Sequence, residues 1–179
     1  MMLHPIVVHF PIALLTLYSG LELLRWRRCA ELPFWTPLKG FLVIVGSGSS
    51  FLALATGKLL EDQFRNDPIL YRVVEAHSFW ANITTWVYAL LALAYLLVLA
   101  DRLGWIGVVE QSWSNAARLS SVLRRAAAWA DTLTQSLGGA LVALVGLIAL
   151  TITGALGGSL IYGPAVDPIV ELVYRLYGF

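Results

Sequence analysis

Four long apolar stretches limit what this chain can fold into more than any other feature of its sequence. They run over about residues 6–24, 40–60, 78–100 and 138–161. A helix needs about 20 mainly apolar residues to cross a bilayer, because the hydrocarbon core is about 30 Å thick and a helix rises about 1.5 Å per residue. Lipid offers no partner to unpaired backbone groups, so each stretch is predicted to be a transmembrane helix.

The composition agrees with lipid as the main solvent. The 179 residues are 59% hydrophobic and only 13% charged, and the mean hydropathy is +0.76, which is too apolar for an ordinary soluble domain. A net charge of +1 excludes a nucleic-acid partner. The single cysteine, Cys29, excludes a disulfide framework and covalent haem attachment. We therefore predict an all-α membrane protein, a four-transmembrane-helix bundle in one domain over residues 1–179, with no evident repeat.

Charge asymmetry between the loops predicts the orientation in the membrane. Eight basic residues lie in the first loop and in the long connection over residues 101–137: Arg25, Arg27, Arg28, Lys39, Arg102, Arg118, Arg124 and Arg125. Four lie on the other side: Lys58, Arg65, Arg72 and Arg175. The positive-inside rule then places the long connection inside and both termini outside. In a Gram-negative bacterium this is the inner membrane, with both termini in the periplasm.

Two segments outside the spans have helical character. In the long connection, apolar residues from Ala116 to Trp129 recur at helical spacing with arginines between them, which predicts an amphipathic helix on the inner surface. In the tail, Glu171 and Arg175 form an i, i+4 pair beside an apolar face. The tail is predicted to be a short interfacial helix at the outer side.

The histidines are the candidate site residues. Ionisable residues are otherwise nearly absent from the middles of the spans, which disfavours a proton relay or a transporter of charged substrates. His4, His9 and His77 all lie at the outer side. Steps of three or four residues from His9 lead to small side chains, which predicts that this face is turned inward: Ala13, Thr16 and Gly20. The same reasoning predicts an inward face for His77, followed by Ala81, Thr84 and Tyr88. It also applies to two stripes that contain glycine. The first is Gly46, Ser50, Ala53 and Gly57, and the second is Gly154 and Gly158.

Two inward histidines on different helices are what a bis-histidine b-type haem requires, so we predict His9 and His77 as axial ligands of haem iron. His4 is a further candidate for cofactor binding, but it is about 140° from His9 on an ideal helix. An interfacial role is favoured for it. Pro11 is expected to kink the helix beside His9. Two alternatives stay open: the histidines simply hydrogen-bond neighbouring helices, or one of them holds another pigment such as a chlorophyll. A structural zinc site is disfavoured, because the nearest carboxylates lie at helix ends.

The segment LHPIVVHFPIALL, from Leu3 to Leu15, resembles the opening signature of a bacterial membrane protein family, domain of unknown function 2231 (DUF2231). The likeness continues weakly through Ala55–Gly57 and returns at Gly154–Pro168, where Gly163 and Pro164 stand in place of the family's usual Arg and His. The resemblance implies a four-span bundle. It also implies a neighbourhood of c-type cytochrome and Rieske-type iron–sulfur domains, and hence electron transfer at the outer side.

The sequence thus leads to two hypotheses for function. The first is a membrane b-type cytochrome-like electron-transfer subunit that holds haem b near the outer face and exchanges electrons with an outer redox protein, such as a c-type cytochrome, and with other membrane subunits. The second is a cofactor-free accessory subunit of a larger respiratory or photosynthetic complex. Neither makes the chain an enzyme on its own. A small-molecule transporter is a third hypothesis, disfavoured by the scarcity of buried charge.

Overall fold

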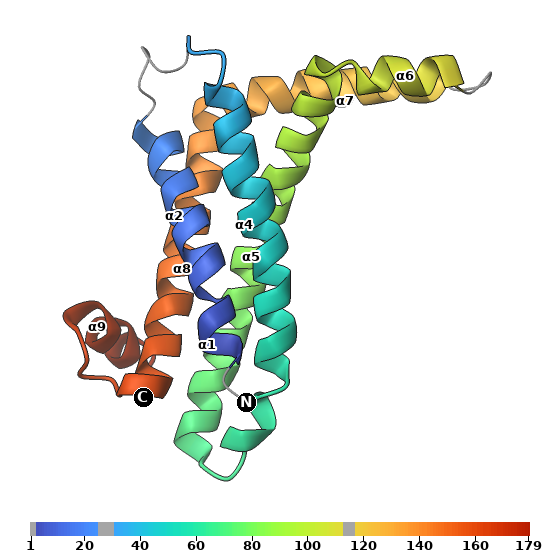
Figure 1. Cartoon of the computed structure of the whole chain (residues 1–179). Helices are drawn as coiled ribbons and strands as arrows, with labels where there is room; N and C mark the ends of the chain where they lie inside the picture. Colours follow the sequence, from blue (N-terminus) through green and yellow to red (C-terminus); the bar gives the residue numbers. More distant parts are fainter. Residues whose placement is uncertain (1–2, 25–30, 113–116) are drawn as a thin grey trace.

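The fold is a bundle of long helices, seen in a computed structural model that describes residues 3–24, 31–112 and 117–179 (Figure 1). The bundle consists of α1 (Leu3–Val7), α2 (His9–Leu24), α4 (Trp35–Lys58), α5 (Pro68–Arg102) and α8 (Leu137–Tyr162). A 3₁₀ turn, η1 (Glu61–Phe64), joins α4 to α5. Four of these segments are long and apolar enough to cross a membrane, with α1 and α2 counted as one. The predicted all-α four-span bundle is confirmed.

The two ends of the bundle differ. Both chain termini lie at one end, here called the terminal end, where α9 (Pro168–Leu176) packs against α8 (Figure 1). At the other end, here called the arm end, α6 (Trp105–Ser112) and α7 (Ala117–Gln135) pair and extend sideways from the bundle. Helix α7 is the amphipathic helix expected in the long connection, and α9 is the expected tail helix. Helix α6 was not anticipated.

The third span begins ten residues earlier than the apolar stretch suggests, at Pro68 instead of residue 78. The cause is an N-terminal cap: Asp67 Oδ1 accepts hydrogen bonds from the amides of Ile69 and Leu70 at 2.9 and 3.1 Å. Proline at the first helical position adds a preset φ angle. Helix α5 therefore projects beyond the apolar region, past the other helices at the terminal end (Figure 1).

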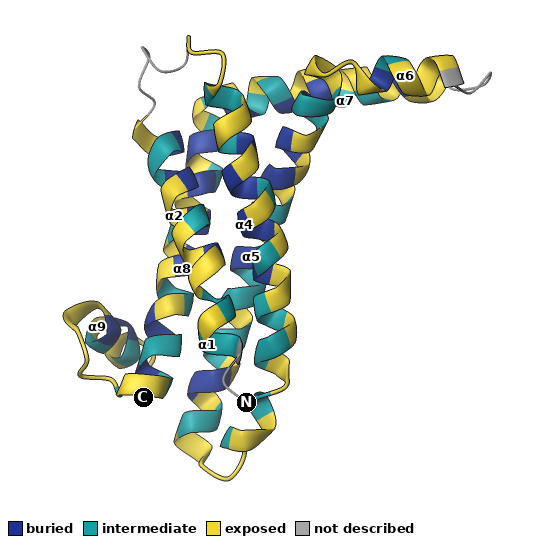
Figure 2. Ribbon diagram, viewed as in Figure 1, coloured by how far each residue is buried: buried dark blue, intermediate teal, exposed yellow. Residues whose placement is uncertain are grey.

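The helices pack in a ring. Helix α2 contacts α4, α4 contacts α5, α5 contacts α8, and α8 returns to α2, so that α2 and α5 occupy opposite corners. Large apolar side chains are exposed on the outside of this ring, for example Leu17, Leu90 and Val145. Figure 2 shows the exposed positions of each helix in yellow. The interior combines aliphatic side chains such as Leu91 with tyrosines, small residues and a few polar groups. An apolar outer surface of this kind is what lipid as the surrounding solvent requires.

The first span is interrupted at Val8, between α1 and α2. Val8 donates to the His4 carbonyl at 3.0 Å and Ile12 donates to the Val8 carbonyl at 3.2 Å. Pro11 has no amide hydrogen, so it cannot donate to the carbonyl four residues earlier. The distortion expected beside His9 is therefore present, at Val8.

Candidate functional site

A cavity of about 320 Å³ lies inside the terminal end of the bundle. All three histidines contribute to its wall, together with residues of α4, α5 and α8. Hydroxyl groups line its deeper part: Ser50, Thr84, Thr85 and Thr153. Its volume lies near the lower limit of the range of about 300–1,000 Å³ that is typical of ligand pockets. The cavity is the natural place to look for a bound group.

His77, on α5, is oriented by the neighbouring helix α8. Its Nδ1 donates to the carbonyl of Thr153 at 2.9 Å, which leaves the lone pair on Nε2. Nε2 has no hydrogen-bond partner among the described residues. Every fully buried side-chain nitrogen or oxygen atom of these residues does have a partner, so an atom without one is not fully buried. Nε2 is therefore accessible from the cavity. The ring packs on Gly157, where a Cβ would come within 3.0 Å of Cε1.

His4, on α1, has a matching environment against α4. Its Nδ1 lies 3.0 Å from the Thr56 hydroxyl. That hydroxyl can donate its hydrogen to the carbonyls of Leu52 or Ala53, at 3.1 and 3.0 Å. When the hydroxyl donates in this way, its oxygen accepts from His4 Nδ1 and the lone pair is again on Nε2. The ring packs on Gly57, where a Cβ would come within 3.2 Å of Cε1. His4 is half-buried between two helices, which is a more enclosed place than the interfacial one expected for it.

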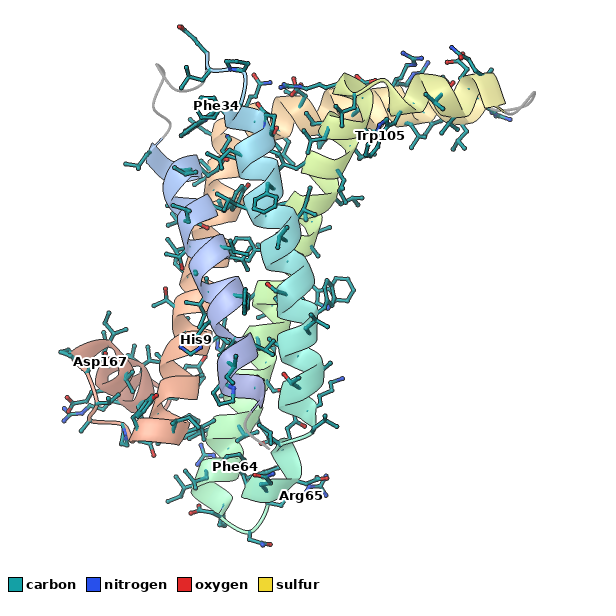
Figure 3. All side chains as sticks on the ribbon, in the orientation of Figure 1. His9, Phe34, Phe64, Arg65, Trp105 and Asp167 are labelled. Carbon is teal, nitrogen blue, oxygen red and sulfur yellow. The ribbon has the colours of Figure 1, made fainter. Side chains whose placement is uncertain are left out.

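His9 lies at the rim of this cavity, near the beginning of α2 (Figure 3). Its Nδ1 donates to the Pro5 carbonyl, one turn back on its own chain, and the side chain is exposed. The inward face predicted from His9 is wrong, since Ala13 and Thr16 are exposed as well. The buried face of α2 carries other residues: Pro11, Leu15, Tyr18, Ser19 and Glu22.

The physical reason for this error is that large and small core residues are on different helices. Large side chains of α2 and α5 fill the interior, and the glycines that accept them are on α4 and α8. Leu15 lies against Gly46, where a Cβ would come within 2.6 Å of Leu15 Cδ2. A small-residue stripe on α2 was therefore not needed for packing. The inward faces predicted for α4 and for His77 on α5 do agree with the burial pattern. The inward face predicted for α8 does not hold at Gly154, which is exposed.

A second polar group, which the sequence analysis missed, lies toward the arm end. Glu22 is only 3% exposed and accepts from Lys39 Nζ at 2.8 Å, and the lysine side chain is 12% exposed. The Tyr95 hydroxyl donates to the same carboxylate at 3.1 Å. Glu22 falls within the first apolar stretch of the sequence. A carboxylate inside a span requires a partner, so Glu22 could have indicated this buried polar group.

Three tyrosines continue this polar group toward the middle of the bundle. Tyr18 meets the rings of Tyr88 and Tyr95 edge-on, with centroids 6.2 and 5.8 Å apart. The Tyr88 hydroxyl is hydrogen-bonded to Ser19 Oγ at 2.7 Å. All three rings are fully buried. The Tyr95 hydroxyl is bonded to Glu22 and the Tyr88 hydroxyl to Ser19, so the ion pair and the tyrosines form one buried polar cluster inside the bundle.

Comparison with known proteins places the first part of the chain. No curated protein and no solved structure gives a significant match. A family model described as "Predicted membrane protein (DUF2231)" matches residues 1–65, the part that contains His4, His9 and Gly57. The resemblance noted in the opening segment is therefore confirmed: this is the region in which the chain is similar to the DUF2231 membrane proteins.

Proposed function

We propose that this protein is a membrane b-type cytochrome-like electron-transfer subunit that holds haem b in the cavity at the terminal end. One observation carries the proposal. His77 and His4 stand on different helices of the same cavity, and each has Nδ1 engaged by a neighbouring helix with Nε2 open. A hydrogen bond at the second ring nitrogen is the usual way in which a ligating histidine is oriented.

The number of candidate ligands also favours haem over a bare metal ion. Among the described residues there is no group of three or more His, Cys, Asp or Glu side chains that could hold a metal ion. A structural zinc site needs about four such ligands. A porphyrin supplies four nitrogens itself, so two histidines complete the coordination of its iron. The bound group would supply the one-electron chemistry, and the protein's part would be to bind and orient it.

The cavity wall offers room and charge for such a group. Gly154 and Gly158 of α8 line it, and a Cβ at Gly154 would meet nothing within 4 Å. A flat ligand can therefore extend past α8 toward the lipid. Lys58 also lines the cavity, and its ammonium could pair with a propionate. On this proposal the ligands are His77 with His4, and His9 at the rim takes a secondary place.

The proposal includes an orientation. The arm end carries Arg102, Arg118, Arg124 and Arg125, so the positive-inside rule favours this end on the cytoplasmic side of a bacterial inner membrane. The cavity and both termini would then be near the periplasmic face. Electrons would pass between an outer-side redox protein, such as a c-type cytochrome, and other membrane subunits.

A reduced-minus-oxidised absorption spectrum, with a pyridine haemochrome assay, tests the proposal on protein purified in mild detergent. We expect a b-type α-band at about one haem per chain, in accordance with one bis-histidine site. The His77→Ala variant should show little or none of this band, because only one histidine ligand of the iron remains. A control, Thr132→Ala on α7, should keep it. A colourless preparation from haem-replete cells would sink the proposal.

The second candidate is the cofactor-free accessory subunit, and the arm is the feature that favours it. Trp105 and Trp129 of the arm are 60% and 76% exposed, and the arm stands clear of the bundle (Figure 3). Such a surface can lie on lipid or against another subunit. This candidate predicts partners that co-purify with a colourless protein.

A further inference from the structure

We infer that the bundle is a duplicated helix hairpin, and that His4 and His77 are equivalent residues of its two halves, facing one ligand from opposite sides of a pseudo-twofold axis. The first half is α1, α2 and α4, and the second is α5 and α8. The identity of the ligand as haem rests on the proposed function. The pairing of the two histidines does not.

The buried positions of α2 recur on α5, where Thr85 and Ala94 are buried in addition. Setting His4 against His77 gives a numbering offset of 73 residues. With this offset, each of the five buried residues of α2 corresponds to a buried residue of α5: Pro11, Leu15, Tyr18, Ser19 and Glu22 correspond to Thr84, Tyr88, Leu91, Ala92 and Tyr95. The register is set by the histidines alone, so the agreement of the buried faces is an independent result.

The second helices match with an offset of 100 residues, and the contacts repeat with them. His4 packs on Gly57 as His77 packs on Gly157, with a Cβ distance to Cε1 of 3.2 Å in the first half and 3.0 Å in the second. Each histidine is thus oriented by the same face of the following helix in its own half.

A second pair of contacts repeats one step deeper in the bundle. Leu15 meets Gly46, and Tyr88 meets Gly146, where the added Cβ would lie 2.6 and 2.8 Å from the partner side chain. Large residues of the first helix thus enter glycine gaps of the second helix in both halves.

The offset of 100 continues beyond the bundle. Asp67-Pro68-Ile69 begins α5, and Asp167-Pro168-Ile169 begins α9. In both cases the aspartate Oδ1 accepts from the same two amide positions. The two offsets differ by 27 residues, which places the additional length in the connection that forms the arm of α6 and α7. The arm is therefore an insertion into one copy of the hairpin.

The packing order agrees with this symmetry. A twofold axis parallel to the helices exchanges α2 with α5 and α4 with α8, which are the opposite corners of the ring. Parallel repeats with such an axis along the membrane normal are known in membrane proteins. His4 and His77 line the same cavity. His9 corresponds to Asn82, so it has no counterpart that could act with it across the axis.

A cross-linking experiment tests the pairing without any ligand. In a Cys29→Ser background, His4→Cys with His77→Cys should react with o-phenylenedimaleimide about tenfold faster, as an intramolecular link, than His9→Cys with His77→Cys, because proximity raises the effective concentration. The two double variants differ only in the position of one thiol on the first span. Equal rates, or a faster reaction of the His9 variant, would overturn the pairing.

Spectra of single variants separate this inference from the proposed function and do not depend on the cysteine variants. With haem bound, His4→Ala should change a six-coordinate low-spin spectrum into a five-coordinate high-spin one, and His9→Ala should leave it low-spin. Loss of the low-spin form in His9→Ala alone would refute the pairing while haem binding stands. Rapid cross-linking in a protein that never binds haem would refute the proposed function while the pairing stands.

Discussion

Glu22→Leu should lower the free energy of unfolding by about 3–5 kcal/mol, which is the usual effect of removing one partner from a buried ion pair. The Lys39 side chain is 12% exposed, and its Nζ lies 2.8 Å from Glu22 Oε2. The substitution also removes the acceptor of the Tyr95 hydroxyl. Lys39→Met should have a similar effect, because it leaves the carboxylate inside the bundle without its cation. Reversible unfolding in mixed detergent micelles, followed by tryptophan fluorescence, gives the measurement.

The double variant Glu22→Leu with Lys39→Met should recover much of this loss, since no buried charge remains unpaired. An exposed pair provides the control. Arg175 and Glu171 form an ion pair on α9, with the side chains 76% and 43% exposed. Glu171→Ala should change the free energy of unfolding by no more than about 1 kcal/mol. If the loss in the double variant equals the sum of the losses in the two single variants, the two charges do not stabilise each other.

Gly146→Ala should destabilise the bundle by about 1–3 kcal/mol, the usual cost of overpacking. A Cβ at this position would lie 2.8 Å from Tyr88 Cζ. The Tyr88 ring cannot move aside easily, because it is fully buried, meets Tyr18 edge-on and holds Ser19 through its hydroxyl. Thermal unfolding in detergent, with near-ultraviolet circular dichroism as a reporter of the tyrosine cluster, measures the effect.

Gly48→Ala is the matched control for this glycine. Gly48 is also inside a transmembrane helix, but a Cβ there would meet nothing within 4 Å. Alanine has a higher helix propensity than glycine by up to about 1 kcal/mol, so this variant should be neutral or slightly more stable. If both alanine variants unfold at the same temperature, Tyr88 yields to the added methyl group and the contact is not tight.

The spans could be predicted from the sequence because membrane thickness turns an apolar run directly into a helix. Their ends could not, since caps such as Asp67 act outside the apolar run. The burial pattern of α5 was also accessible, as the inward position of Thr84 and Tyr88 shows. These features depend on local sequence, or on one helix at a time.

The features that the sequence did not reveal depend on which helices meet. A stripe of small residues on α2 suggested that His9 faces inward, but the fit of Leu15 to Gly46 turns that stripe outward. The correspondence of the two halves stayed hidden because it uses two different offsets, separated by the arm, and few identical residues. Gly46 and Gly146 are among the few that remain. Only the structure shows that both glycines accept a large side chain from the first helix of their half.

The Glu22–Lys39 pair also bears on how the chain enters a membrane. A single charged side chain opposes the insertion of a span, by about 2.5–3.5 kcal/mol at the helix centre and by less toward its ends, where Glu22 and Lys39 lie. Glu22 and Lys39 lie on consecutive spans, so each compensates the other only when both spans leave the translocon together. The corresponding positions of the second half are Tyr95 and Gly139, which carry no charge. We expect the first half to insert as one unit and the second helix by helix, and an insertion assay on chains truncated after residue 34 or after residue 66 would show whether the first span waits for its neighbour.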